Sequence, residues 1–349
     1  MTARRAGGTT LRPLHVAVAS ACLLGAFFAG VTLGPAQLGW WAVLKELVSH
    51  LPLVDVDSGL TEREATILWE LRVPRVVLGG LVGATLASAG AAYQGVFRNP
   101  LADPYLLGVA AGAGLGATLV ISYGPDTSDW PVDLLPIAAF VGAVVGVGLA
   151  YTLGRSGGPG RNAATLVLSG VAVTAFLTAG QTYVQQRNAD TLREVYAFIL
   201  GRLGTFGWKD VLLILPYVTI SAVVILLHRR LLDVLRMGDE GAETLGVQVG
   251  RVRIVVVLAA TLGTAAAVAV SGLIGFVGII VPHCIRLVAG SSYRRVVPLS
   301  LLLGAAFLIV ADVLARTLSS PAELPIGVVT AFFGAPFFAL VLRTSRRTA

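Results

Sequence analysis

The sequence predicts an all-α polytopic membrane protein that crosses the bilayer about ten times. Of its 349 residues, 56% are hydrophobic, 41 are glycine and only 13% are charged, whereas charged residues make up roughly 25% of a soluble domain. This composition leaves too little polar surface to coat a water-soluble globule, and it also excludes disorder. The long unbroken apolar runs favour helices over the alternating strands of a membrane barrel.

Ten apolar segments are each long enough for a bilayer-crossing helix, which needs about 20 residues. They cover approximately residues 14–34, 74–94, 105–123, 134–153, 163–186, 210–228, 252–270, 273–290, 296–316 and 324–342. Only small residues around Ser271 and Gly272 separate the seventh segment from the eighth, so nine spans are the alternative. The first segment follows a basic stretch, as a signal peptide does, but its apolar run continues to Val31, so we expect a retained helix.

The distribution of Lys and Arg predicts that both termini are cytoplasmic. In this orientation the inner segments, including an N-terminal tail over 1–13, hold about two thirds of the 26 basic residues and about a quarter of the 19 acidic ones. The bias supports an even number of spans. The net charge of +7 therefore reports topology and does not argue for nucleic-acid binding. We expect one transmembrane domain over 1–349, embedded in the cytoplasmic (inner) membrane.

Small residues recur at four-residue spacing within three of the predicted spans. Lipid gives no hydrophobic drive between helices, so such stripes allow helix backbones to approach closely. Tight packing and the lining of a pathway both remain open for them. The stripes are Gly79, Gly83, Ala87 and then Gly90; Gly142, Gly146 and Ala150; and Gly108 with Gly112.

Arginines mark the outer ends of the second and ninth segments. Arg72 lies at the end of an outer loop over 35–73 that is rich in carboxylates, and Arg75 directly follows this loop. They either anchor a helix end by snorkelling or form a docking site for an acidic partner. Arg316 either neutralises Asp312 on the same helix face or projects outward as a third surface cation.

Two prolines interrupt the chain at the inner end of the second segment. Pro100 and Pro104 forbid a continuous helix, so this stretch predicts a rigid, hydrogen-bonded turn that includes Asn99 and Leu101. The turn is either a structural connector or a constriction at the end of a pathway.

The longest inner connection covers residues 229–253. Within it we predict a short amphipathic helix with Glu240 and Glu243 in its first turn, where carboxylates complement the helix dipole, and with Leu245 and Val247 as apolar knobs. A helix that lies outside the membrane between two spans is well placed to contact another protein.

The sequence lacks the residues that several kinds of binding or catalytic site require. The sequence has no G-x-x-x-x-G-K-[ST] phosphate loop, no His, Cys or carboxylate set at metal-ligand spacing, and no paired catalytic carboxylates. We predict no catalytic residue, no metal site and no cofactor in this chain. Few charges fall at mid-membrane, which disfavours the alternative of an ion-coupled secondary transporter. Energy for uphill transport is then expected from another subunit.

Taken together, these features resemble the FecCD family, whose members are the permease subunits of type II ABC importers for siderophores, haem and cobalamin. The resemblance follows the family's order over nearly the whole chain after residue 70. The stretches that carry it are LRVPR at 71–75, the Gly83–Gly90 run that leads to Gln94, RNPLADP at 98–104, GFVG at 275–278, Pro282-His283 with Arg286, AELPIGVV at 322–329 and GAP at 334–336.

The resemblance implies a homodimer, or a dimer with a paralogue, whose pathway lies at the subunit interface. It also implies two ATPase subunits inside, which hold ATP and Mg²⁺, and a substrate-binding protein outside. The implied cargo is a metal chelate, with a ferric siderophore ranked first and cobalamin or haem close behind.

By the same similarity, particular residues acquire roles. Arg72, Arg75 and Arg316 match arginines that meet acidic residues of the binding protein. Asn99 and Leu101 match an inner gate, and the loop before the fifth span resembles a second gate, although Ala163 and Ala164 stand where hydroxyl residues can occur. The residues that resemble those of a coupling helix seated on the ATPase are Glu240, Glu243, Leu245, Gly246 and Val247.

Overall fold

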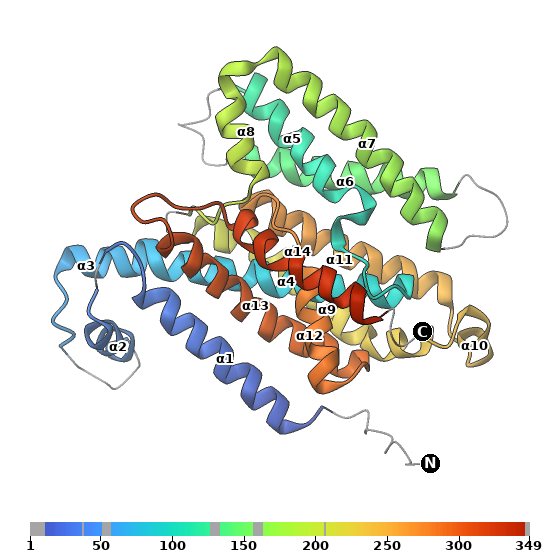
Figure 1. The fold of residues 1–349 in the computed structure, drawn as a ribbon, viewed down its shortest axis with the longest axis horizontal. Coiled ribbons are helices and arrows are strands. Elements are labelled where there is room, and N and C mark those ends of the chain that lie inside the picture. The colour runs from blue at the N-terminus through green and yellow to red at the C-terminus, as the bar shows by residue number, and fades with distance from the viewer. Residues whose placement is uncertain are drawn as a thin grey trace.

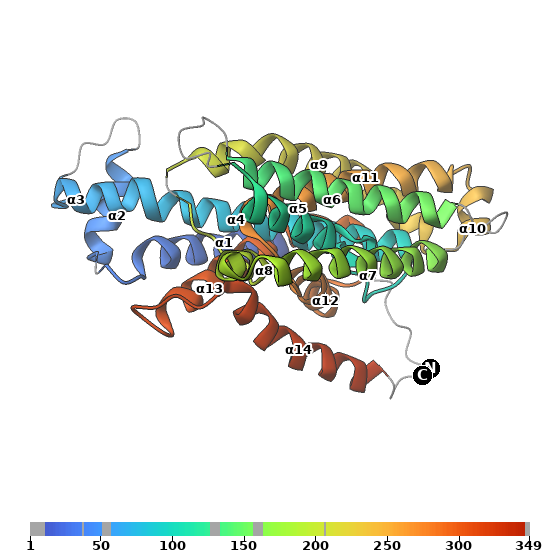
Figure 2. The ribbon, with the colours of Figure 1, turned by 90° about the horizontal axis from the view of Figure 1, so that it is seen from above.

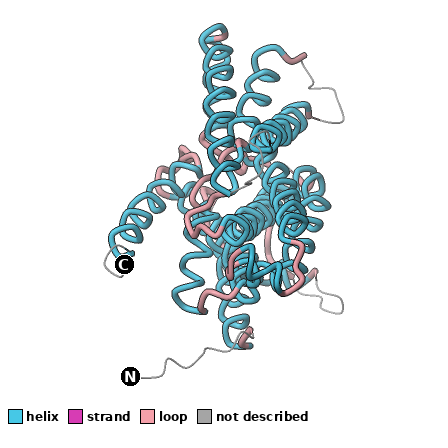
Figure 3. The backbone as a smooth tube through the Cα atoms, turned by 90° about the vertical axis from the view of Figure 1, so that its right-hand side faces the viewer, coloured by secondary structure: helices cyan, strands magenta, loops and turns pink. Residues whose placement is uncertain are grey.

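The chain folds as a bundle of helices. A computed structural model describes residues 11–36, 38–50, 57–125, 133–155, 163–205 and 207–345, and every regular element within them is a helix (Figure 3). Seven of these helices are long and apolar enough to cross a membrane, and three shorter apolar helices accompany them. The predicted fold class is confirmed. The ten helices are α1 (Pro13–Thr32), α4 (Val73–Phe97), α5 (Val109–Tyr123), α6 (Leu134–Arg155), α7 (Ala163–Arg187), α9 (Lys209–Leu235), α11 (Val249–Ser271), α12 (Val277–Ala289), α13 (Tyr293–Thr317) and α14 (Ile326–Ser345).

Three helices form the centre of the bundle. In an apolar 18-residue stretch of the spans that contain α4, α11 and α13, 78%, 72% and 67% of the residues are buried, against 22% to 33% in the other four long spans. α5, α6 and α7 pack against one another on one side (Figure 1). α14 packs chiefly on α12 and α13 and projects away from the rest (Figure 2).

The connecting elements gather at the two ends of the bundle. α10 (Asp239–Thr244) lies at one end, toward which α1 begins and α14 ends, and α2 (Trp40–Ser49) and α3 (Glu62–Thr66) lie at the other (Figures 1 and 2). We call the end with α10 the inner end and the opposite end the outer end. This arrangement agrees with an even number of crossings.

The break between the seventh and eighth spans is real. α11 ends at Ser271 and α12 begins at Val277. Gly272 between them has φ +67°, and a Cβ there would lie 2.1 Å from the carbonyl oxygen of Phe198. Only glycine readily adopts this positive φ and fits into this space. The chain leaves the helical conformation at Gly272, so the two spans are separate helices.

The small-residue stripes serve close packing. A Cβ added to Gly83 of α4 would lie 2.3 Å from the carbonyl oxygen of Gly304 in α13. One added to Gly112 of α5 would lie 2.1 Å from the carbonyl oxygen of Gly142 in α6. The backbones of each pair of helices lie so close that a side chain would not fit at either glycine. The packing interpretation therefore holds for both pairs.

The second span begins earlier than predicted. Its helix runs from Glu62, not from residue 74, and passes through η1 (Ile67–Arg72), a stretch of π-helix, into α4. A capping box starts it: the Thr61 hydroxyl accepts a bond from the N–H of Glu64 at 3.3 Å, and the Glu64 carboxylate accepts one from the N–H of Thr61 at 2.9 Å. Because Pro74 has no N–H to donate, the wider π turn ahead of it keeps the helix continuous.

The predicted outer loop over 35–73 is largely helical, since it holds α2, α3 and η1. Its carboxylates have structural roles. Glu46 of α2 accepts a bond from the indole N–H of Trp69 at 3.1 Å, which ties α2 to η1. The hydrogen bond from Ser58, followed by that from Trp69, lowers the pKa of Glu46. Asp55 lies outside the described residues.

The inner connection is shorter than 229–253. α9 continues to Leu235 and α11 starts at Val249, so residues 236–248 join the two helices and include α10. Most of the predicted tail over 1–13 and most of the gate-like loop before the fifth span, over 156–162, lie outside the described residues.

Candidate functional site

Charged residues from four parts of the chain meet at the outer end of the bundle. Arg72 comes from η1, Arg75 from α4, Asp312 and Arg316 from α13, and Glu323 from the segment after α13. We call these five residues the outer arginine cluster. Asp312, Arg72 and Arg316 are buried, whereas the side chain of Glu323 is 46% exposed.

Arg75 holds two carboxylates at once. Its Nη2 lies 2.9 Å from Asp312 Oδ1 and 2.9 Å from Glu323 Oε2, and its Nη1 donates to Glu323 Oε1 at 3.0 Å. The contact with Glu323 is therefore bidentate, the strongest geometry available to an arginine and a carboxylate. The side chain of Arg75 remains 17% exposed.

Arg72 and Arg316 bind the last turn of α1. Arg72 Nη1 donates to the carbonyls of Val31 at 2.9 Å and Thr32 at 2.8 Å, and its Nη2 donates to the carbonyl of Ala36. Arg316 Nη2 donates to the carbonyl of Gly30 at 3.0 Å. The last carbonyls of a helix have no intrahelical partner and carry partial negative charge, so both guanidinium groups stabilise the end of α1.

This geometry decides between the two interpretations of Arg316. Its Nε lies 2.9 Å from Asp312 Oδ2, so the pairing within α13 is confirmed. The expectation that Arg316 projects outward is wrong, because its side chain turns toward α1. Arg72 is likewise buried and does not snorkel. Docking of a binding protein on these arginines stays a prediction, and Arg75 is the member that solvent reaches.

At the inner end, residues 98–104 form the expected rigid turn. Arg98 ends α4 in the left-handed region with φ +51°. The Asn99 side chain accepts a bond from the N–H of Leu101 at 2.9 Å, and its carbonyl accepts one from Ala102 at 3.1 Å. These hydrogen bonds hold the turn in one conformation. The gate role of Asn99 and Leu101 stays a prediction.

Gln94 fastens this turn to α12. Its Nε2 donates to the carbonyls of Ala102 at 3.2 Å and Gly278 at 2.9 Å, and its Oε1 accepts a bond from Arg286 at 2.5 Å. One buried amide thus joins α4, the turn and α12 through hydrogen bonds, so the position of the turn is coupled to both helices.

Asp103 caps the short helix η2 (Pro104–Leu107) that follows the turn. Its carboxylate accepts a bond from the N–H of Tyr105 at 2.9 Å. Burial raises the pKa of Asp103 to about 6, and the single hydrogen bond from Tyr105 opposes that rise only in part. The carboxyl group therefore gains a proton within the physiological range.

The predicted coupling segment is exposed over most of its length. Glu240, Glu243, Leu245 and Gly246 face solvent on or just after α10. Two details differ from prediction. Glu243 is the fifth residue of α10 and not in its first turn, which holds Asp239 and Glu240. Val247 is not a knob, because its side chain packs against the core, whereas Met237 offers an exposed apolar side chain that the sequence argument missed.

Asp239 links this segment to the turn. Its Oδ1 lies 3.2 Å from Arg98 Nη2 and 3.2 Å from Arg253 Nη2. Arg98 is the residue at which α4 becomes the turn, and Arg253 stands in the first turns of α11. A single carboxylate therefore connects α10 with both the turn and a central helix of the bundle.

The model of the FecCD transport family matches residues 22–344. The chain belongs to this family.

This FecCD-family chain is similar to transport permeases of known kinds. It is 42% identical over 288 residues to the cobalamin import system permease protein BtuC of Halobacterium salinarum. The matched region covers 82% of this chain and 76% of the relative. It is 36% identical over 289 residues to the Fe(3+)-citrate import system permease protein YfmE of Bacillus subtilis, with coverage of 83% and 85%. A solved metal-chelate type ABC transporter in an inward-facing conformation matches with a TM-score of 0.81 at 25% identity, over 95% of this chain and 100% of that one.

Two residues of the FecCD-family chain gain importance only from the structure. Glu323 pairs with Arg75 and Asp239 pairs with Arg98, both far away in the sequence, and no spacing rule connects these partners. The one available signal was charge, since both are acidic residues placed beside segments with predicted roles. Among the described residues, no three His, Cys, Asp or Glu side chains gather as a metal site would require.

Proposed function

We propose that the chain is the permease subunit of an ATP-binding-cassette importer of the cytoplasmic membrane. It works as a dimer with two ATPase subunits at the inner end and a substrate-binding protein at the outer end. Membership of the FecCD family, the match to an ABC transporter over 95% of the chain and the absence of a phosphate-binding loop support this proposal. ATP and Mg²⁺ belong to the ATPase subunits, and this chain carries out no chemical reaction.

The observation that carries the proposal is the double contact of Asp239 with Arg98 and Arg253. An ATPase seated on the exposed residues of α10 displaces Asp239 when it closes around ATP. The ion pair with Arg98 passes that displacement to the turn at Asn99 and Leu101, and Gln94 passes it on to α12. ATP thereby selects one of two packings, and it acts only through their difference in stability.

A second copy of the chain is proposed to cover the face formed by α7 and α14. α14 projects from the bundle (Figure 2), and Phe332 and Phe333 on it are exposed, as is Phe176 on α7. A dimer through this face places the pathway between the two copies. A paralogue with the same face fits equally.

At the outer end, Arg75 is proposed as the principal contact for an acidic binding protein. Its guanidinium is the accessible one, and its bond to the exposed Glu323 can be exchanged for a bond to a partner's carboxylate. Arg72 and Arg316 add positive potential, which favours correct orientation and a fast encounter more than it favours affinity.

The proposed cargo is a metal chelate. A ferric siderophore remains first, with cobalamin or haem next. The relatives named above import cobalamin and ferric citrate, so similarity supports the class of cargo. The ligand that the associated binding protein retains on purification identifies the member.

Co-purification tests the proposal. A tag on the permease should recover an ATPase with a phosphate-loop motif from membranes of cells that express the whole system. Replacing Leu245 by Asp in the exposed part of the coupling segment should abolish that recovery. Leu153→Asp, at an exposed position of α6, tests whether any change from Leu to Asp has the same effect, and Glu62→Lys is a surface control at the outer end. Full recovery with Leu245→Asp, or transport by the permease without any ATPase, contradicts the proposal and favours an ion-coupled secondary transporter.

A further inference from the structure

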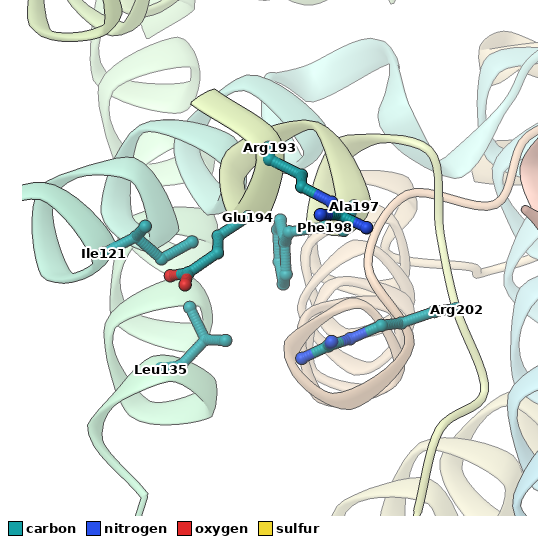
Figure 4. A pocket seen from close by; sticks show the side chains of 7 residues that line it. All are labelled: Ile121, Leu135, Arg193, Glu194, Ala197, Phe198 and Arg202. Atoms are coloured by element: carbon teal, nitrogen blue, oxygen red, sulfur yellow. The ribbon is translucent and has the colours of Figure 1, made fainter. Parts of the chain in front are cut away.

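An open cavity of about 550 Å³ lies at the outer end, beside the outer arginine cluster. α8 (Leu192–Ile199) supplies Arg193, Glu194 and Phe198, and Arg202 follows it; the end of α5 and the first turn of α6 close the other side. Figure 4 shows Arg193 and Arg202 extending toward the region beside Phe198, with the Glu194 carboxylate on the opposite side, near Leu135.

The two arginines lack partners of their own. Among the described residues, neither guanidinium group has a hydrogen-bond acceptor or a carboxylate within ion-pair distance, and both side chains are exposed. The outer end otherwise carries an excess of acidic residues. Among the described residues that line the cavity, two guanidinium groups without a partner face one carboxylate, which makes the site net positive and suits an anion that also carries a hydrogen-bond donor.

An apolar groove begins next to this cavity. It has a volume of about 170 Å³ and runs between α6, α9 and α11, lined by Ile137, Phe140, Leu213 and Tyr217 among others. Leu135 lines the charged cavity and the neighbouring Pro136 lines the groove, so both border the first turn of α6. Ile137, Leu213 and Tyr217 are exposed, as expected of side chains that face hydrocarbon.

The height of the charged cavity matches the membrane surface. Tyr196 on α8 and Trp208 just before α9 are exposed at the same end of the bundle. Exposed Tyr and Trp mark the level of lipid headgroups in membrane proteins. The cavity therefore lies at headgroup height, and the groove lies below it among the spans.

We infer that this site binds an anionic phospholipid of the outer leaflet, of the phosphatidylglycerol type. Its phosphate binds Arg193 and Arg202, a glycerol hydroxyl donates to Glu194, and one acyl chain lies in the groove beside Leu213. Arg202 also borders the small cavity beneath Arg75 and Glu323, which makes an acidic protein the competing occupant. A protein lobe outside the membrane does not reach a groove between the spans, so the groove favours the lipid.

Titration of the purified full-length protein with phosphatidylglycerol, followed by native mass spectrometry, tests the inference. The double variant Arg193→Gln/Arg202→Gln should lose about tenfold or more in affinity for phosphatidylglycerol, since two charge-assisted bonds are removed. Arg63→Gln, at an exposed arginine of α3, is the matched control and should bind as the wild type does. Equal thermal transitions in phosphatidylcholine alone show that the double variant is folded.

A second variant tests the groove without changing charge. Leu213→Trp fills it and should also weaken phosphatidylglycerol binding, while phosphatidylcholine binds weakly to every variant. Unchanged phosphatidylglycerol binding by the double variant overturns the inference. An equal loss of phosphatidylglycerol affinity in Arg63→Gln also overturns it, and so does an affinity that Leu213→Trp leaves unchanged. If the double variant no longer associates with the binding protein but still binds phosphatidylglycerol, the inference is overturned in favour of the acidic protein. The inference needs only a membrane-embedded chain, so it stands or fails apart from the proposed transport function.

Discussion

Replacing Asp239 by Asn should uncouple ATP hydrolysis from transport. The change removes the charge that holds Arg98 and Arg253, both at 3.2 Å, but keeps the size of the side chain. The side chains of Asp239 and Arg98 are 42% and 40% exposed, so that pair contributes about 0.2–1 kcal/mol. Arg253 is only 13% exposed, and a hydrogen bond to a charged group is worth about 1.5 kcal/mol or slightly more there. Together the contacts contribute about 2 kcal/mol, which corresponds to a factor of about 30.

The assay is the number of ATP molecules hydrolysed per molecule imported, in proteoliposomes that contain the assembled transporter. With Asp239→Asn we expect this ratio to rise by about fivefold to 30-fold while the ATPase remains bound, since part of the coupling free energy is lost. Asp233→Asn is the control for lost stability alone. Asp233 caps α13 through Ser292 at 2.6 Å and the N–H of Tyr293 at 2.7 Å, and has no contact with the turn.

A double-mutant cycle separates the path from a general weakening. Arg98→Gln should raise the ratio by itself, and its combination with Asp239→Asn should add little, because both changes remove the same ion pair. An unchanged ratio in Asp239→Asn, or an equal rise in Asp233→Asn, refutes the reasoning about the coupling path.

Three further predictions concern the outer arginine cluster and the turn. Glu323→Gln frees Arg75 and should raise the affinity for the binding protein by up to about fivefold in surface plasmon resonance; a lower affinity would mean that Glu323 itself contacts the partner. Arg72→Gln should lower the free energy of unfolding by about 2–4 kcal/mol, because carbonyls at the end of α1 lose their hydrogen-bond donor. An unchanged thermal transition would mean that Arg72 does not stabilise the fold. The pKa of Asp103 is raised from 3.8 to about 6, so the native state binds the proton more tightly and loses stability as pH rises from about 4 to 6. Asp103→Asn should remove that loss, so its stability relative to the wild type should grow by about 1–3 kcal/mol between pH 4 and pH 7, and a pH-independent difference would contradict the assignment.

Much of the fold was accessible from the sequence because membrane spans are recognised by composition alone. The ten apolar segments and the glycine stripes each rest on one-dimensional patterns, and each has a counterpart in the helices described, whereas the orientation expected from the Arg bias stays a prediction. The start of the second span was missed for a physical reason. Its first turns, from Glu62, are polar because they lie outside the hydrocarbon, and the capping box at Thr61 was the signal that would have located them.

The candidate site was less accessible, since its charges are paired across the fold. Arg72 and Arg316 look like surface cations in the sequence, and only the position of α1 shows that they bind its last carbonyls. The bridge from Asp239 to Arg98 likewise depends on how α10 folds back toward the end of α4. Charged groups near a membrane surface find partners through three-dimensional packing, which sequence spacing does not encode.

Uptake of a metal chelate into proteoliposomes tests the central claim most directly, namely that this chain is a passive conduit driven by its partners. With the ATPase subunits, a loaded binding protein and ATP, the chain should concentrate the chelate inside, and it should stop when the phosphate-loop lysine of the ATPase is replaced. The chain reconstituted alone should move nothing uphill. Accumulation against a gradient by the solitary chain, with or without an ion gradient, would contradict the account.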